Sequence, residues 1–286
     1  QSLILRAHWS PGARGAQYML SSFIENLFLV FGDPRCRKDL DGTSKLSAHM
    51  RFGEVSPRQL YHTIRLVVSI WENRDAEARK AVLECAKAFL KKLCLRDYAY
   101  HVLFFHPYAI DQPLVSEMKM FPWLDDSHSY RRWLTGTTGY PIIDAAMRQL
   151  RAVGWIHNSL RLLLATFLSK VLMLPWQIGL RDMQLLLIDG DWSCNMLGWQ
   201  WSCGVNHDSF PFHVFVNPME MGKLLDPEGL FIKRWCPELV ALPCGFVHAP
   251  WMAPAEILVR SNVYLDQNYP SPVVDYGVAR NRFSEA

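Results

Sequence analysis

The chain has 286 residues, of which 50% are apolar and 13% aromatic, including 11 tryptophans. This length allows a complete hydrophobic core, in one large domain or in two small ones. The net charge of +3 is too small to indicate a nucleic-acid-binding protein by composition, although it leaves a local basic face open. The most apolar stretch, residues 160–176, contains Arg161, Lys170 and Pro175, so we expect a core helix and no membrane partner.

The start of the chain and its cysteines indicate the compartment. Residues 1–12 carry no initiating Met and no basic-then-apolar leader, so we expect no signal peptide and interpret them as a linker remnant from an upstream domain. The seven cysteines form an odd set without a C-x-x-C pair, which favours reduced thiols over a disulfide framework or a zinc site. We therefore expect an intracellular, reducing compartment: cytoplasm, nucleus or plastid.

The first part of the chain predicts a succession of helices. Apolar residues recur at helical spacing across residues 18–31 and are followed by a polar loop. Ser56 and Pro57 are a good N-cap and a good first helical residue for the next helix. Residues 75–105 predict one long helix or two in tandem, ending before His106-Pro107 because a residue that precedes proline disfavours helical backbone.

The second part continues the helical pattern. Residues 140–155 predict one helix, and residues 157–174 predict another that stops at Pro175. Beyond Asp189, glycines and prolines mark loops until a last short helix within residues 226–239. The chain shows few β-α-β signals and neither the Rossmann nor the P-loop glycine fingerprint. We therefore expect an all-α fold that binds any cofactor between helices.

Polar residues at 43–47 form a first candidate site. The hydroxyls of Thr43, Ser44 and Ser47, with nearby backbone N–H groups and the basic Lys45, can hold a phosphate or pyrophosphate. The same pattern is also typical of an ordinary Ser/Thr turn.

A second candidate site combines a helix and a loop. Asn158 and Arg161 are three residues apart, so they share a helical face, which we expect to point inward. A buried arginine needs an anionic partner, and Asp189 or Asp191 in the loop 189–195 is the natural one. Two carboxylates without a third oxygen ligand do not indicate a metal site, and no G-x-S-x-G pattern indicates a serine nucleophile.

Four long segments resemble, in family order, the FAD domain of the cryptochrome/photolyase family. The resemblance covers residues 9–268. It implies a helical FAD-binding domain at residues 13–268, with the family's α/β antenna domain absent and residues 269–286 forming a C-terminal tail. The segments are GTSKLSAHMRFGEVSPRQ, TGTTGYPIIDAAMRQLRAVGWIHNSLR, LIDGDWSCNMLGWQW and DPEGLFIKRWCPELVALP.

The resemblance also implies which residues bind FAD. Arg161 is expected to pair with Asp189 near the isoalloxazine, and Asn195 to face flavin N5, where an amide resembles photolyases and an acid resembles plant cryptochromes. Lys45 stands where the family usually has arginine. The implied FAD-binding residues are Phe31, Thr43, Ser44, Lys45, Leu46, Ser47, Phe89, Arg96, Asn158, Arg161, Asp189, Asp191 and Asn195.

Three tryptophans match the electron relay of the family. The resemblance implies that Trp199 is the proximal member, Trp176 the middle member and Trp133 the distal member, which together photoreduce the flavin by relaying an electron hole outward. Each of these residues taken singly is also typical of core packing.

The lesion-facing positions fit the family's repair enzymes less well. Lys92 and Leu95 stand where similar photolyases carry Glu and Trp, and Ser159 replaces an arginine that contacts DNA phosphate. Trp201 keeps the lesion-facing aromatic ring. Losing the carboxylate and one stacking surface disfavours repair of a flipped pyrimidine dimer.

The sequence therefore predicts a blue-light-responsive FAD flavoprotein with a photosensory role and a signalling protein as its partner. Asn195 and Trp201 favour an alternative, a light-driven DNA photolyase, which is a carbon-carbon lyase acting on cyclobutane pyrimidine dimers in damaged DNA. A third reading is a helical interaction module without flavin, which the retained Arg161, Asp189 and Asn195 disfavour.

Overall fold

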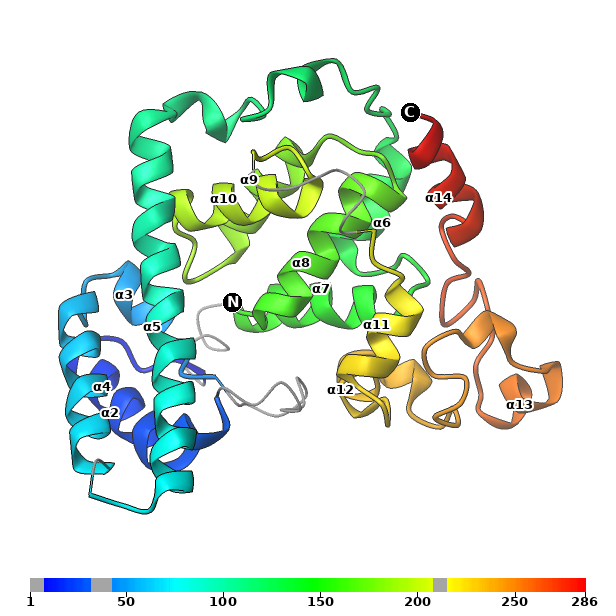
Figure 1. Cartoon of the computed structure of the whole chain (residues 1–286). Coiled ribbons are helices and arrows are strands. Elements are labelled where there is room, and N and C mark those ends of the chain that lie inside the picture. The colour runs from blue at the N-terminus through cyan, green and yellow to red at the C-terminus, as the bar shows by residue number, and fades with distance from the viewer. Residues whose placement is uncertain (1–7, 32–42, 72, 208–214) are drawn as a thin grey trace.

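The computed structural model describes residues 8–31, 43–71, 73–207 and 215–286. Over these residues the chain is built of helices, with one isolated bridge between Leu265 and Tyr269 and no strand, which confirms the all-α prediction (Figure 1). The α-helices are α2 Ala13–Ser22, α3 Leu46–Arg51, α4 Pro57–Trp71, α5 Ala76–Phe105, α6 Ser127–Thr135, α7 Pro141–Val153, α8 Asn158–Thr166, α9 Trp176–Leu186, α10 Trp192–Cys203, α11 Pro218–Leu225, α12 Leu230–Trp235, α13 Ala255–Arg260 and α14 Tyr276–Glu285.

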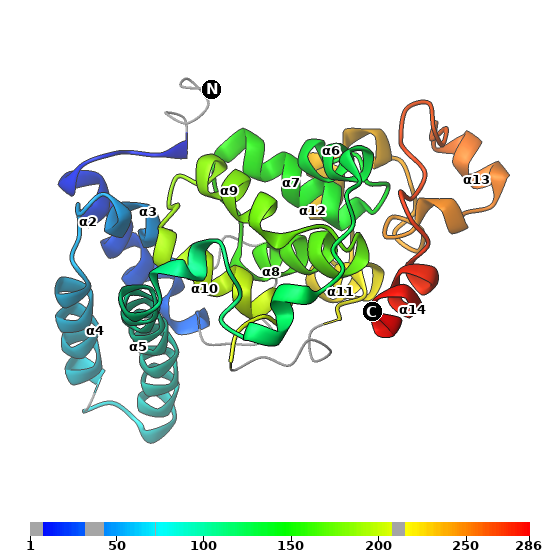
Figure 2. The ribbon, with the colours of Figure 1, turned by 90° about the horizontal axis from the view of Figure 1, so that it is seen from above.

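The described helices bury two apolar clusters. The smaller cluster lies between α2, α3, α4 and the first two thirds of α5, and the larger one is formed by the helices that follow. Figure 2 shows α4 and α5 side by side at one end of the molecule and α13 and α14 at the other. The aromatic content noted in the sequence is thus largely explained by packing.

Helix α5 belongs to both clusters. The Asp75 side chain caps its start by accepting from Ala78 N at 2.9 Å, and the helix ends before His106-Pro107, as predicted. Phe89 is buried in the smaller cluster and Val102 in the larger one. One unbroken helix of 30 residues therefore joins the two cores.

The segment predicted as a helix over residues 157–174 ends earlier than expected. Helix α8 is followed by a π-helical turn, Phe167–Val171, in which Leu172 N donates to Phe167 O, five residues back, at 2.9 Å. Met173 then takes a left-handed conformation with φ 54°, which ends the helix before Pro175. The periodicity of the sequence does not distinguish this π-turn from regular helix.

The segment that the sequence analysis assigns to a tail, residues 269–286, contains α14. Ala279 and Phe283 of this helix are buried, and Arg282 donates to Val171 O in the π-helical turn at 2.9 Å. The helix therefore packs onto the larger core instead of extending from it.

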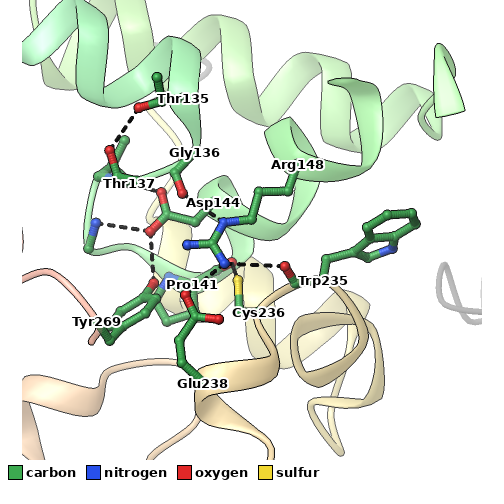
Figure 3. Close-up of polar contacts among 12 residues, drawn as sticks. Thr135, Gly136, Thr137, Pro141, Asp144, Arg148, Trp235, Cys236, Glu238 and Tyr269 are labelled. Carbon is green, nitrogen blue, oxygen red and sulfur yellow. Dashed lines mark hydrogen bonds and ion pairs between the residues drawn. The ribbon is translucent and has the colours of Figure 1, made fainter. Parts of the chain in front are cut away.

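A buried carboxylate organises the start of α7. Asp144 is fully buried, and its oxygens accept hydrogen bonds from Thr138 N at 2.6 Å, Thr138 Oγ1 at 2.7 Å, Gly139 N at 3.0 Å and Tyr269 OH at 2.8 Å (Figure 3). Burial raises the pKa of Asp144, and the hydrogen bonds from Thr138 and Tyr269 oppose that rise. The carboxylate ties the α6–α7 loop to the segment before α14.

Arg148, one turn further along α7, extends this network. It donates to Gly136 O at 2.9 Å and to Glu238 Oε1 at 2.7 Å, and Figure 3 shows its guanidinium between the α6–α7 loop and the segment that follows α12. Both side chains of the Arg148–Glu238 pair are largely buried. This network explains structurally why the segment around Asp144 is rich in polar residues.

None of the described helices combines the length and the apolarity needed to cross a bilayer. The cysteines within the described part of the chain are free thiols: Cys85, Cys203 and Cys236 are buried, whereas Cys94 and Cys244 are exposed.

Lys170 in the π-helical turn is fully buried, with its Nζ 5.9 Å from the centre of the Phe283 ring. Burial lowers the pKa of Lys170 from 10.5 to about 8. We expect Lys170→Met to remove the contribution of this lowered pKa to the pH dependence of stability, because methionine does not titrate.

The free energy of unfolding of the wild type should therefore rise relative to that of Lys170→Met between pH 8 and 10.5. In this range wild-type Lys170 is neutral when folded and protonated when unfolded, so the unfolded wild type binds more protons and wild-type stability rises with pH relative to the variant. Urea unfolding of both proteins at pH 7, 9 and 10.5 measures this difference. A difference that stays constant over this range contradicts the prediction. Lys87→Met, at a side chain 71% exposed, is the matched control.

Candidate functional site

A cavity of about 190 Å³ opens between α8, the loop before α10, and α10 itself. Both predicted polar clusters of this region contribute to its wall. Asn158 and Arg161 come from the first turns of α8, the two aspartates from the loop, and the aromatic residues from α10. Its lining includes Asn158, Arg161, Asp189, Asp191, Asn195, Trp199 and Trp201.

The predicted ion pair lies in this wall. Arg161 Nη2 donates to both carboxylate oxygens of Asp189, at 2.8 and 3.0 Å, and Arg161 Nε donates to Ile156 O at 3.2 Å. The Asp189 side chain is only 3% exposed, whereas that of Arg161 is 26% exposed. The guanidinium thus neutralises a buried carboxylate on one side and presents positive potential to the cavity on the other.

Asp191 forms a second polar group at the cavity. Its Oδ1 caps α10 by accepting from Cys194 N at 3.0 Å, and its Oδ2 accepts a hydrogen bond from Tyr100 OH and lies 4.0 Å from Arg96 Nη2. Arg96 also donates to Tyr100 OH at 3.1 Å. Burial, with the hydrogen bond that Tyr100 donates to Asp191, raises the pKa of Tyr100 to about 12, so the phenol stays protonated.

Asn195 is held by the neighbouring helix α9. Its Nδ2 donates to Leu180 O at 3.1 Å and to Gln184 Oε1 at 3.0 Å, and Gln184 Nε2 donates in turn to Gly190 O at 2.7 Å. These bonds fix the amide plane at the cavity wall. An amide in this position can exchange hydrogen bonds with a ligand but holds no readily transferable proton.

Residues 43–47 lead into α3. Lys45 is left-handed, with φ 51°, and Leu46 N donates to Ser44 Oγ at 3.4 Å. Lys45 Nζ lies 5.6 Å from the centre of the Trp155 ring. Thr43 Oγ1 is buried and has no hydrogen-bond partner among the described residues. A buried hydroxyl of this kind is expected to find a partner when a ligand is bound.

The predicted aromatic contacts lie in the smaller core. Phe31 and Phe89 pack with ring centroids 5.5 Å apart, and both lie 5.4 Å from Phe23. Leu46 is buried in the same cluster, and Ser47 follows it, partly buried, in α3. None of these side chains is in the wall of the α8–α10 cavity.

The three predicted relay tryptophans are all buried. Trp199 lines the cavity, and Trp133 contacts it directly with ring centroids 6.3 Å apart. Trp133 is 0% exposed, and Trp176, the first residue of α9, is 1% exposed.

The positions that would face a lesion are more open. Leu95 on α5 is 51% exposed and Trp201 is 42% exposed. Lys92 is exposed, with its Nζ 5.7 Å from the centre of the Phe31 ring, and Ser159 N donates to His157 Nδ1 at 3.1 Å.

Sequence reasoning missed three residues of the site. Tyr100 lies four residues after Arg96 on α5, so helical spacing could have identified it. Trp155 is buried, and its Nε1 has no hydrogen-bond partner among the described residues. Gln184 lies in an amphipathic helix and carries no local signal of its role.

Comparison with known proteins identifies a cofactor of this chain. Residues 89–286 match the model of the FAD binding domain of DNA photolyase, so FAD is the cofactor. The residues present fit this cofactor. The unpartnered Thr43 hydroxyl, the Arg161 guanidinium and the amide of Asn195 offer the hydrogen bonds that phosphates and a flavin ring require.

Relatives include proteins named cryptochrome and proteins named deoxyribodipyrimidine photo-lyase. The chain is 39% identical over 285 residues to Cryptochrome-1 of Arabidopsis thaliana, covering 100% of the chain and 41% of that protein. It is 34% identical over 274 residues to a deoxyribodipyrimidine photo-lyase of Agrobacterium fabrum, covering 96% of the chain and 55% of that protein. The chain thus spans about half the length of the curated relatives that it matches.

Solved structures confirm the fold. A bacterial class III photolyase from Agrobacterium tumefaciens superposes with a TM-score of 0.90 at 33% identity, over 98% of this chain and 56% of that one. A cryptochrome from Synechocystis superposes with a TM-score of 0.86 at 26% identity, over 97% of this chain and 56% of that one.

Proposed function

Since the chain belongs to the cryptochrome/photolyase family, we propose that it is a blue-light-responsive FAD flavoprotein with a photosensory role. One observation carries the proposal. The Arg161–Asp189 pair, the amide of Asn195 and the indole of Trp199 meet at one cavity, so a cation, a hydrogen-bonding group and an electron donor face the same space. The bound FAD supplies light absorption and accepts an electron.

The residues of the chain then have separate tasks. Thr43, Ser44 and Ser47 offer hydroxyls to the pyrophosphate, and Arg161 lowers the free energy of negative charge in the cavity. Asn195 holds a hydrogen bond without delivering a proton. Trp199 donates an electron into the cavity.

Exchanging the proximal tryptophan tests the electron donor. We expect Trp199→Phe to bind FAD but to photoreduce it slowly or not at all, because phenylalanine fills most of the space and is far harder to oxidise. Flavin absorbance under blue light in the presence of a thiol reductant measures the rate. Trp192→Phe on the same helix, at a ring 41% exposed and outside the cavity wall, is the control. Normal photoreduction by Trp199→Phe would refute the assignment.

The photosensory role is favoured over repair by the replaced lesion-facing residues. Lys92, Leu95 and Ser159 stand where a carboxylate, an indole and a guanidinium would hold damaged DNA. We therefore infer a signalling protein as the partner and expect photoreduction without repair of ultraviolet-damaged oligonucleotide.

DNA photolyase activity is the second candidate. The half-exposed Trp201 at the cavity wall and the amide at Asn195 favour it, and several relatives carry the name deoxyribodipyrimidine photo-lyase. Restoration of thymines in an irradiated oligonucleotide under blue light would select this activity. A well-folded chain that remains colourless with excess FAD would remove both candidates and leave the flavin-free interaction module.

A further inference from the structure

A phenol on α5 holds the carboxylate that begins α10. Asp191 Oδ2 accepts a hydrogen bond from Tyr100 OH, and Tyr100 lies 91 residues earlier in the chain. Asp191 Oδ1 accepts from Cys194 N at 3.0 Å and so caps α10. Each carboxylate oxygen therefore has a protein donor that fixes its direction, while the carboxylate itself lies in the cavity wall.

An arginine lies close enough to compete with this phenol for the carboxylate. Arg96 Nη2 is 4.0 Å from Asp191 Oδ2, beyond hydrogen-bond distance, and it donates to Tyr100 OH at 3.1 Å instead. Arg96 and Tyr100 are four residues apart on α5, so they share one face of the helix. The phenolic oxygen thus bridges the two charged groups, because it accepts from the guanidinium and donates to the carboxylate.

The bridge preserves a negative charge at the cavity. The Asp191 side chain is 12% exposed and that of Arg96 is 21% exposed, so solvent ions screen this pair only weakly. A guanidinium that donated directly to Asp191 would form a charge-assisted hydrogen bond, roughly twice as strong as a bond between neutral groups. Tyr100 keeps its proton at neutral pH, since burial and the bond to Asp191 raise its pKa to about 12.

We propose that Tyr100 is a positioning residue of the FAD site, which keeps Arg96 off Asp191 so that the carboxylate stays a negatively charged acceptor toward bound FAD. The inference rests on the proposed function, in which FAD occupies this cavity. Without the phenolic oxygen, Arg96 loses an acceptor and Asp191 loses a donor, and the two charged groups close the 4.0 Å between them. The arginine then offsets the negative charge that the carboxylate presents to the cavity.

Tyr100→Phe removes the hydroxyl and keeps the ring. We expect this variant to bind FAD about 3- to 10-fold more weakly than the wild type, because an acceptor at the cavity wall is no longer held in place. We also expect a more positive midpoint potential of the bound flavin, since an offset carboxylate opposes the charge gained on reduction less strongly. Fluorescence titration with added FAD measures the affinity, and a spectroelectrochemical titration in the dark measures the potential.

Two further variants separate this role from packing. Tyr264→Phe is the matched control, because its ring is 40% exposed against 43% for Tyr100, and it should change neither quantity. The second is Tyr100→Phe in an Arg96→Gln background, with FAD added to saturation. There the loss of the hydroxyl should leave the midpoint potential unchanged, because no guanidinium remains to pair with Asp191.

The outcomes distinguish the positioning role from the proposed function. A midpoint potential that Tyr100→Phe leaves at the wild-type value overturns the role of Tyr100, and so does a shift of the same size with and without Arg96. In both cases the proposed function stands, since the wild type binds FAD. A wild type that binds no FAD removes the proposed function and the positioning role together.

Discussion

Replacing Arg161 by leucine should yield a protein that no longer retains FAD. The variant loses the cation at the cavity and leaves the Asp189 carboxylate, 3% exposed, without its counter-ion. Breaking such a pair costs about 2–4 kcal/mol, since the remaining charge stays buried. The cavity also loses one charge-assisted hydrogen-bond donor, and a loss of about 1.5–3 kcal/mol in binding weakens FAD affinity by about 10- to 100-fold. Flavin absorbance after gel filtration, with fluorescence titration of added FAD, measures the loss.

A double variant separates binding from stability. Arg161→Leu with Asp189→Leu removes both charges, so the free energy of unfolding should recover relative to Arg161→Leu alone, whereas FAD binding should not. Arg181→Leu is the matched control, because its pair with Asp111 has both side chains at least 60% exposed and contributes at most about 1 kcal/mol. FAD retained at wild-type affinity by Arg161→Leu would show that the pair is structural only.

A large loss of stability is also expected from Asp144→Asn. Each carboxylate oxygen of Asp144 accepts one backbone N–H and one hydroxyl, from Thr138 on one side and from Gly139 and Tyr269 on the other. Whichever way the amide turns, its NH2 group faces a backbone N–H. We expect unfolding to require about 3 kcal/mol less free energy, because buried donors lose their acceptor without access to water. Thermal and urea unfolding measure the change.

Two further variants check the origin of this loss. Tyr269→Phe removes only one of the four hydrogen bonds and should cost about 1–2 kcal/mol. Asp75→Ala removes an exposed carboxylate that accepts one backbone N–H and should cost about 1 kcal/mol. If Asp144→Asn is no more harmful than Asp75→Ala, the buried network does not stabilise the fold as described.

The helices were predictable where local signals agree. The aspartate that caps α5 and the proline that follows its end both lie close to the helix in sequence. Local signals therefore suffice to predict a helix over these 30 residues. The π-turn after α8 could not be predicted from the sequence. Over so few residues it shows the same apolar pattern as a regular helix and differs from it in a hydrogen bond that spans five residues. The helical nature of residues 276–285 was also missed, since Phe283 finds its apolar environment in a distant part of the chain.

The part of the site that the sequence predicts is the ion pair, because a buried charged side chain needs a partner of opposite charge. Arg161 had to meet an acid, and the sequence offered two nearby, of which Asp189 is the partner in the structure. The sequence did not indicate that Trp133 lies buried beside Trp199, because neither the order of the motifs nor their spacing shows how deeply a side chain is buried. The hydrogen bond from Tyr100 to Asp191 joins residues 91 positions apart and appears only when α5 packs on α10.

The single helix that runs through both apolar clusters has a thermodynamic consequence. Opening the smaller core exposes Phe89, while Val102 on the same helix stays buried in the larger core. The helix is about 45 Å long at the rise of an α-helix, and it would have to break in its middle for its two ends to separate. We therefore expect the loss of one core to lower the stability of the other, so that the two unfold together.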